Sequence, residues 1–144
     1  MPYHPMGPDE LRAFLTSEPA RTAVLATVRA DGRPHAAPVW YALDGDDVVF
    51  MTVAASVKGR NLRRSGRAAL CIDDERPPFS FVSIEGPVEL GDDPDELLHW
   101  GTVIGGRYMG ADRADEYGRR NAAPGELLVR LHPERVISAG DVAG

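Results

Sequence analysis

The sequence predicts one small antiparallel β-barrel, mostly β with short helices at its ends. Segments rich in β-branched and other apolar residues recur along the chain, and Asp-Gly turns join the first three. Parallel neighbours would need long crossover connections, so strands that follow each other this closely are antiparallel. The 144 residues, 43% of them hydrophobic, are enough for one core, and no repeat or linker divides them. We therefore expect a single domain over residues 1–144.

Six segments are predicted strands: TAVLATVR, HAAPVWYAL, VVFMTV, RAALCI, FSFVSIEGPVELG and ELLVRLHPERVISAG. The first three are expected to form a meander across their tight turns. Pro38 cannot donate a ladder hydrogen bond, so it marks an edge or a bulge in the second strand. Gly86-Pro87 is expected to bend the fifth strand, and Pro133 breaks the last one. This order of elements predicts a closed barrel.

Three short helices are expected, one before the first strand and two between later strands. Proline and acidic residues are typical of a helix start and open a helix over 8–17. Ser56 is placed to cap a second helix, which Ser65-Gly66 ends. A third helix is expected to begin at 92–96. The stretch 101–121 contains too many glycines to continue it, although RADEYGRR allows a turn or two.

Composition and charge argue against several classes of protein. A net charge of −6 and a pI near 5.1 argue against nucleic-acid binding, which needs a clustered positive field. The basic run KGRNLRRSGR at 58–67 is local and favours a small anionic ligand. No signal-peptide pattern or membrane-spanning stretch is present, so we expect a cytoplasmic protein without membrane contact. The scattered histidines argue against a metal site, and Cys71 is expected to be a buried, unreactive thiol.

No self-sufficient catalytic group emerges from the sequence, which lacks Gly-x-Ser-x-Gly and any Ser, His and Asp arrangement. The segment FMTVAASVKGRNL is the best candidate for a binding site. Thr52, Ser56 and Lys58 lie where a strand passes into a helix, which is where hydroxyls, free N–H groups and a cation together bind phosphate. The alternative is that Ser56 only caps the helix and that Lys58 to Arg64 form a solvated basic face. The spacing alone leaves both interpretations open.

The ordered pieces resemble the split-barrel flavin-binding superfamily typified by pyridoxamine 5′-phosphate oxidase. Phe50 to Thr52, then Ser56 and Lys58, then Leu62, followed by AALCI and IEGPVEL, match the superfamily pattern. Upstream, TVRADGRPHAAPVWY resembles its first hairpin. The resemblance implies a six-stranded antiparallel split β-barrel that forms a homodimer, with a cofactor bound between the two subunits.

Two details resemble the actinobacterial branch that uses the deazaflavin coenzyme F420. They are the spacing from Lys58 through Asn61 to Arg64 and the later run Arg107-Tyr108-Met109-Gly110. The resemblance implies that Lys58 and Asn61 hold the phosphate end of the cofactor, with Ser56 in the same cradle. Further cofactor contacts are implied for Pro38, Val39, Trp40, Met51, Thr52 and Val53, and from the partner subunit for Phe79 to Ser83. Tyr108 is a candidate substrate contact, with a packed structural residue as the alternative.

The implied function is an F420-dependent oxidoreductase that transfers a hydride between the reduced deazaflavin and a small conjugated substrate. The cofactor carries this chemistry, so no catalytic side chain is expected. An FMN-binding oxidase or flavin reductase of the same fold is one alternative, and a non-catalytic flavin- or haem-binding protein is another. Vitamin-precursor oxidation is not expected, because the chain ends at SAGDVAG without the family's C-terminal substrate clamp.

Overall fold

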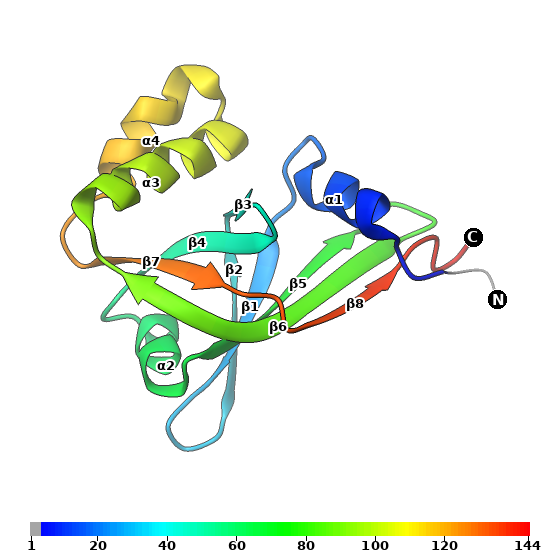
Figure 1. Cartoon of the computed structure of the whole chain (residues 1–144), viewed down its shortest axis with the longest axis horizontal. Coiled ribbons are helices and arrows are strands. Elements are labelled where there is room, and N and C mark those ends of the chain that lie inside the picture. Colours follow the sequence, from blue (N-terminus) through cyan, green and yellow to red (C-terminus); the bar gives the residue numbers. More distant parts are fainter. Residues whose placement is uncertain (1–3) are drawn as a thin grey trace.

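The computed structural model describes residues 4–144, which form eight strands, four α-helices and one 3-10 turn (Figure 1). The helices are α1 (Pro8–Thr16), α2 (Val57–Ser65), α3 (Pro94–Met109) and α4 (Ala114–Asn121), and the 3-10 turn is η1 (Ala111–Arg113). The strands are β1 (Ala23–Val28), β2 (Pro34–Val39), β3 (Tyr41–Asp44), β4 (Asp47–Val53), β5 (Arg67–Asp74), β6 (Ser80–Gly91), β7 (Glu126–Leu131) and β8 (Arg135–Ala139). Within residues 4–144, no helix combines the length and the apolar character needed to cross a bilayer.

The strands form one curled, antiparallel sheet. Seven of them follow one another in the hydrogen-bonded order β2-β1-β5-β6-β7-β4-β3, and β8 adds to β6. The prediction of a mostly β, antiparallel fold with short helices is confirmed. The prediction of a closed barrel is wrong. β2 and β3 are the two end strands of the hydrogen-bonded order and do not pair with each other, so the described chain forms an open half-barrel (Figure 1).

Eight strands replace the predicted six because two predicted strands each divide. The second divides at Trp40 into β2 and β3, and the last divides around Pro133 into β7 and β8. The predicted meander is also wrong, because β2 pairs with β1 whereas β3 pairs with β4 at the other end of the strand order. Trp40 is therefore the residue at which the chain crosses from one end of the sheet to the other.

The long strand β6 bends where the sequence predicts. Its first part pairs with β5 as far as Pro87, and from Val88 it pairs with β7. A Cβ added to Gly86 would lie 2.0 Å from the carbonyl oxygen of His132, so only glycine allows the two backbones to approach this closely. The bend lets one strand join both halves of the curled sheet.

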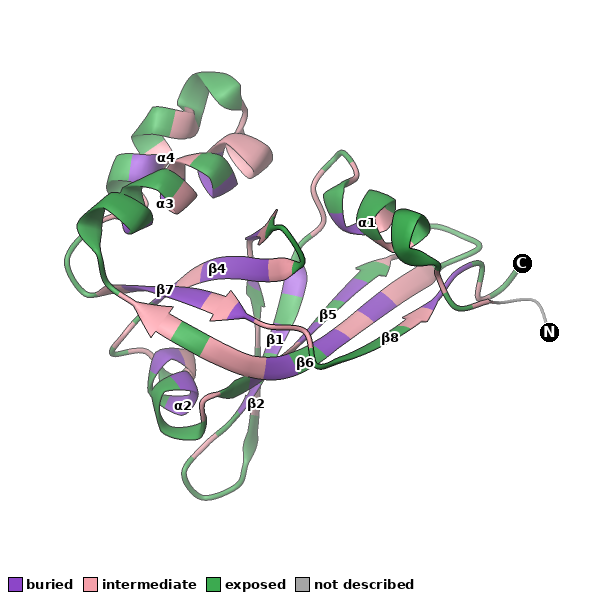
Figure 2. Ribbon diagram, in the orientation of Figure 1, coloured by how far each residue is buried: buried purple, intermediate pink, exposed green. Residues whose placement is uncertain are grey.

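The core fills the inner side of the curl, and Figure 2 shows buried and exposed residues alternating along the strands. The largest fully buried side chains include Tyr41, Phe50, Leu25, Leu70, Ile72 and Ile84. The outer side of β1 and β5 carries mainly exposed residues, and that of β6 carries mainly half-buried ones. Cys71 lies on this outer side and is exposed, so the prediction of a buried thiol is wrong. Strand alternation puts its neighbours Leu70 and Ile72 inside instead.

Helix α3 continues through its glycines, contrary to the predicted break. A Cβ on Gly105 would lie 2.5 Å from the Cβ of Tyr117, and one on Gly101 would lie 3.2 Å from the carbonyl oxygen of Gly118. These glycines allow α4 to pack directly against α3. The close packing of the two helices compensates for the low helix propensity of glycine. RADEYGRR forms α4, as the sequence allows.

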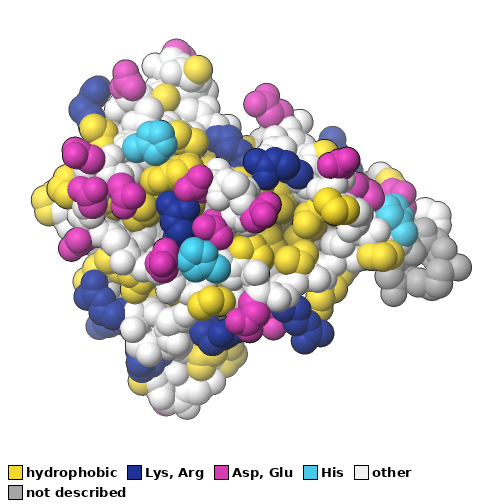
Figure 3. All heavy atoms as spheres, viewed as in Figure 1, with side chains coloured by type: hydrophobic (Ala, Val, Ile, Leu, Met, Phe, Trp, Pro, Cys, Tyr) yellow, Lys and Arg dark blue, Asp and Glu magenta, His cyan; other side chains and the backbone are white. Residues whose placement is uncertain are grey.

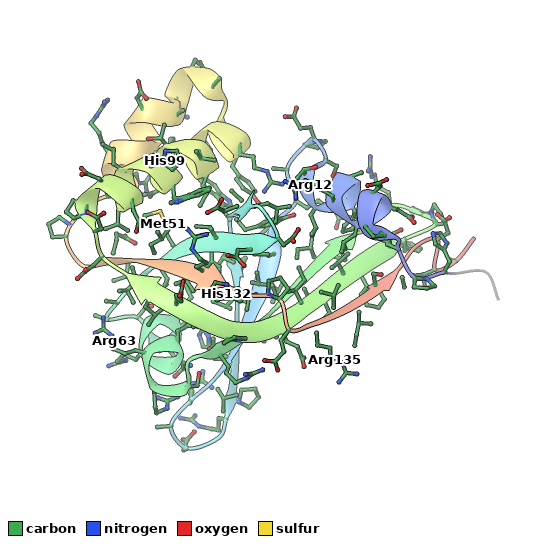
Figure 4. All side chains as sticks on the ribbon, in the orientation of Figure 1. Arg12, Met51, Arg63, His99, His132 and Arg135 are labelled. Carbon is green, nitrogen blue, oxygen red and sulfur yellow. The ribbon has the colours of Figure 1, made fainter. Side chains whose placement is uncertain are left out.

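His132, which directly follows β7, joins three strands through contacts with carboxylates of β4 and β6. Figure 3 shows acidic side chains around basic ones and a histidine near the centre of the face that it draws. The Nδ1 of His132 lies 2.9 Å from Asp47 Oδ1, and its Nε2 lies 3.1 Å from Glu89 Oε2. Figure 4 labels His132 between the strands. The hydrogen bonds with the two carboxylates, that with Asp47 first, raise the pKa of His132 above its ordinary value.

We expect His132→Gln to destabilise the fold more at about pH 6 than at about pH 8.5. A raised folded-state pKa contributes stability below the unfolded value of about 6.5, and this contribution is lost as the pH rises through the folded value. Thermal unfolding midpoints of the variant and the wild type at both pH values measure the effect. His99→Gln, at an exposed position of α3, is the control. Equal losses for His132→Gln at both pH values would contradict the expectation.

Candidate functional site

An open cavity of about 590 Å³ lies between the end of β4, the chain around Trp40 and the helices α3 and α4. Seven residues predicted to contact a cofactor line it together: Pro38, Val39, Trp40, Met51, Thr52, Val53 and Lys58. They come from β2, β4 and the first turn of α2 and from the crossing at Trp40, so residues on either side of Trp40 meet at one site. Figure 4 shows Met51 projecting from β4 toward α3.

The apolar wall of the cavity is built around Trp40. The ring of Tyr108 stacks on the Trp40 ring with centroids 4.9 Å apart and planes 3° from parallel. The Tyr108 hydroxyl donates to the carbonyl of Arg21 at 2.6 Å and accepts from the N–H of Tyr41 at 3.3 Å. Burial raises the pKa of Tyr108. Tyr108 therefore supports Trp40 from behind and is not among the residues that line the cavity.

Arg107, the neighbour of Tyr108, fixes the end of α3 to the rest of the fold. Its guanidinium donates to the carbonyls of Tyr41 and of Leu15, the latter at 2.9 Å. It also lies over the Tyr41 ring, 4.5 Å from the centroid. The run Arg107-Tyr108 thus positions the cavity wall.

Ser56 caps α2, a role that the sequence predicts for it. Its hydroxyl accepts from the N–H of Gly59 at 3.1 Å and donates to the carbonyl of Val53 at 2.6 Å. Ser56 has only one hydroxyl hydrogen, so the buried Thr52 hydroxyl is the donor in the 3.3 Å contact between the two side chains. In this arrangement the donors left for an anion are the Lys58 ammonium and the first N–H groups of α2.

The turn from β4 into α2 folds tightly over the start of the helix. A Cβ on Gly59 would lie 2.3 Å from the carbonyl oxygen of Val53 and 2.7 Å from that of Ala54, so only glycine fits there. The first turn of α2 contains Lys58 and no acidic residue. A cation at the positive end of a helix dipole is unfavourable unless an anion offsets it. The start of α2 is therefore suited to bind an anion.

Asn61 does not line the cavity. It is buried on the inner side of α2, where its Nδ2 donates to Thr27 Oγ1 at 3.0 Å and its Oδ1 accepts from Arg64 at 3.1 Å. The bond with Thr27 ties α2 to β1. The predicted contact of Asn61 with a cofactor phosphate stays a prediction, and the described contacts give Asn61 a structural role.

Phe79 and Ser83 also lie outside the cavity of their own chain. Phe79 is in the turn between β5 and β6, with a φ of 65° and 41% of its surface exposed. Figure 1 shows this turn at the far end of the molecule from α3 and α4. Ser83 lies on β6, opposite Cys71. Their contact with a cofactor from the partner subunit, which the family resemblance implies, stays a prediction.

Apart from Met109, the residues that close the cavity on the side of α3 and α4, its roof, were not identified from the sequence. The roof residues are Ile104 and Met109 of α3 and Tyr117, Arg120 and Asn121 of α4, and Thr22 and Glu126 complete the lining. Tyr117, Arg120 and Asn121 have the i, i+3, i+4 spacing of one helix face, which would have indicated a shared surface. The glycines around them obscured the helix to which that spacing belongs.

The cavity is lined by two cations and one carboxyl group. Neither Lys58 nor Arg120 forms an ion pair with any residue between 4 and 144. Burial raises the pKa of the Glu126 carboxyl, and Lys58 lowers it in part. The positive charges of Lys58 and Arg120, which no ion pair neutralises, favour an anionic ligand.

A family model described as "Pyridoxamine 5'-phosphate oxidase" matches residues 8–139. The chain therefore belongs to the pyridoxamine 5′-phosphate oxidase family, and the resemblance stated from its sequence is confirmed.

The chain is similar to two named reductases. It is 28% identical over 137 residues to the F420H(2)-dependent biliverdin reductase of Mycobacterium tuberculosis, covering 93% of this chain and 89% of that protein. It is 28% identical over 124 residues to a 5a,11a-dehydrotetracycline/5a,11a-dehydrooxytetracycline reductase of Streptomyces rimosus, covering 81% and 72%. A conserved hypothetical protein, Rv2991 from Mycobacterium tuberculosis, has the same fold, with a TM-score of 0.82, 29% identity and coverage of 94% and 86%.

The lining fits a flavin-type cofactor. Such a group needs an anion site for its phosphate and an apolar wall for its ring, and Lys58 and the Pro38–Trp40 wall offer both in one cavity. The volume of about 590 Å³ lies within the range of small-molecule sites.

Proposed function

We propose that this chain is an F420-dependent oxidoreductase that reduces a small, planar, conjugated substrate. The observation that carries this proposal is a single cavity with an uncommitted cation at the start of α2 and an aromatic wall at Trp40. The names of the two reductase relatives support it. A bound deazaflavin would supply the hydride.

The side chains and backbone of the cavity would then bind the cofactor, orient it and exclude water from it. Lys58 and the first N–H groups of α2 would hold the phosphate end of the cofactor, and the segment Met51 to Val53 would contact it. Pro38 and Trp40 would form an apolar wall against its ring and exclude water there. No side-chain acid or base is needed for the hydride step, because the cofactor carries the chemistry and the chain supplies its position.

The experiment that tests this proposal is turnover with reduced F420. The purified protein is mixed with reduced F420 and, in separate reactions, a quinone, an enone and a linear tetrapyrrole, and the return of oxidised F420 is followed by its absorbance. We expect at least one acceptor to be reduced faster than in the protein-free control. Tight binding of F420 without turnover of any acceptor would indicate a binding module instead.

FMN is the second candidate cofactor, because the family to which the chain belongs is named for a flavin-dependent oxidase. The same cavity would hold its phosphate at Lys58 and its ring against Trp40. An FMN enzyme would carry a flavin absorbance through purification and would oxidise a nicotinamide or another donor in place of reduced F420. The visible spectrum of the purified protein distinguishes the two.

We also propose that the chain forms a homodimer through the outer face of its sheet. Five residues of this face align in register across five strands, and we call them the outer row: Pro38, Val24, Cys71, Ser83 and Ile137. Val24 and Ile137 are 45% and 46% exposed, and exposed apolar surface of this kind marks interfaces. Pro38 belongs to both the outer row and the cavity wall, so a second copy seated here would reach the cofactor site.

Val24→Asp is expected to convert the dimer to a monomer. The carboxylate would be buried without a partner at the interface, which is strongly unfavourable, whereas in the single chain it stays exposed and leaves the fold intact. Sedimentation or light scattering measures the mass. Val103→Asp is the matched control, because Val103 is also an exposed valine but lies on α3, away from the outer row, and this variant should keep the mass of the wild type. A monomeric wild type, or a dimeric Val24→Asp, would contradict the proposed interface.

A further inference from the structure

We infer that the face of α4 formed by Tyr117, Arg120 and Asn121 recognises the electron acceptor and selects planar conjugated acceptors that carry an acidic group. This inference rests on the proposed function, because it assigns the acceptor side of the same cavity. We call these three residues the α4 face. All three line the cavity, and α4 belongs to its roof.

The α4 face is held toward the cavity by the packing of α4 on α3. A Cβ on Gly118 would lie 2.0 Å from Thr102 Oγ1 and 3.1 Å from the Thr102 Cα. Gly118 is buried, and it faces α3 at a point where the two backbones approach closely. With that side fixed, the α4 face sits on a rigid element, as a precise recognition site requires.

Arg120 is a cation without an acidic partner in the part of the chain that the structure describes. Two other arginines of this region are paired: Arg113 lies 2.9 Å from Glu116, and Arg130 is paired with Asp44. The Arg120 guanidinium instead lies over the ring of Tyr117, 5.5 Å from its centroid. A guanidinium presents a planar fork of donors that matches a carboxylate.

The aromatic part of an acceptor has its own surface beside Arg120. The rings of Tyr117 and Trp40 both line the cavity, with centroids 6.1 Å apart and planes tilted by 52°. Conjugated rings pack on such surfaces, and the Asn121 amide adds a further donor at the same edge of the helix. Because Trp40 is assigned to the cofactor ring, a planar acceptor with a carboxylate would contact the Tyr117 ring and Arg120 at once.

Arg120 is assigned to the acceptor because the cofactor's anion has its own site elsewhere. Lys58 and the start of α2 lie on one side of β4 and β7, whereas α4 lies on the other side (Figure 1). The cavity therefore offers two separate positive positions. One suits the phosphate of the cofactor, and the other suits an acidic group on the molecule that receives the hydride.

The test compares two quinones that differ in charge, anthraquinone-2-carboxylate and anthraquinone-2-carboxamide. Binding is followed by quenching of tryptophan fluorescence, since Trp40 lines the cavity. We expect the wild type to bind the carboxylate about tenfold more tightly than the amide, the effect of one charge-assisted hydrogen bond. Arg120→Gln should remove this preference and leave the amide affinity unchanged. Arg119→Gln, a neighbouring arginine of α4 that does not line the cavity, should keep the preference.

A second readout is turnover with reduced F420. The reduced deazaflavin loses a hydride and a proton, and the quinone gains both, the proton by way of solvent, to give the quinol. Arg120→Gln should raise KM for the carboxylate about tenfold and leave kcat nearly unchanged, because the contact is the same before and during the hydride step.

The outcomes separate this inference from the proposed function. A weaker affinity of Arg120→Gln for F420, with the carboxylate preference intact, would place Arg120 at the cofactor and overturn the inference while the proposed function stands. Failure of both quinones to bind the wild type would also overturn it. A carboxylate preference that depends on Arg120 in a wild type that does not bind F420 would support the α4 face and refute the proposed cofactor.

Discussion

Lys58→Ala is expected to weaken F420 binding by about 1.5–3 kcal/mol, a rise in Kd of roughly 10- to 150-fold. Lys58 lines the cavity in the first turn of α2, and no ion pair within residues 4–144 engages it. The hydroxyls of Thr52 and Ser56 are used in internal hydrogen bonds. The ammonium is therefore the main charged donor available to a phosphate, and its loss removes a charge-assisted hydrogen bond.

Fluorescence titration of the protein with F420 at low salt measures this effect. Arg63→Ala is the matched control, because Arg63 is on the same helix but does not line the cavity. It should change Kd by less than about twofold, the size of a screened long-range contribution. An unchanged Kd for Lys58→Ala at low salt would show that Lys58 belongs only to a solvated basic face.

Gly105→Ala is expected to lower the free energy of unfolding by about 1–3 kcal/mol, the usual cost of overpacking. On helix propensity alone, alanine would stabilise α3 by about 0.8–1 kcal/mol, so the two effects have opposite signs. The added Cβ would lie 2.5 Å from the Cβ of Tyr117, which is close to the backbone of α4 and cannot rotate away. The packing clash should therefore outweigh the gain in helix propensity, so that Gly105→Ala lowers the free energy of unfolding. Tyr117 should also move from its place in the cavity.

Urea unfolding of Gly105→Ala and the wild type measures the change in stability. Gly91→Ala is the control, because nothing lies within 4 Å of a Cβ at that position. Its unfolding free energy should stay within about 0.5 kcal/mol of the wild type. If Gly105→Ala proves as stable as the wild type or more so, the close packing of α3 on α4 is wrong.

Local sequence signals predicted most of the individual elements. Ser56 and Gly66 bound α2, with Gly66 in the left-handed conformation at a φ of 67°, and Gly86-Pro87 marks the bend of β6. The pairing of the strands was harder to predict. Nothing local to Trp40 indicates that β2 and β3 join opposite ends of the strand order, because that choice depends on partners distant in the sequence.

Only part of the site was predicted, because some of its residues are brought together by contacts between segments distant in the sequence. The lining residues around Thr52 and Trp40 lie in short continuous segments, so the order of these segments along the sequence was enough to identify them. The roof depends on the contact between Gly105 and Tyr117, which turns a poor helix sequence into a stable pair of helices. Cys71 was misplaced because apolar residues occupy both faces of its strand, so the pattern alone does not distinguish inside from outside.

The most direct test of the proposed function is a titration of the apoprotein, separately, with F420 and with FMN. Both ligands are fluorescent, and the two titrations are run on one preparation under the same conditions. We expect F420 to bind at micromolar concentration or more tightly, with FMN clearly weaker. Micromolar or tighter binding of FMN with no binding of F420 would contradict the assignment of the cavity to a deazaflavin.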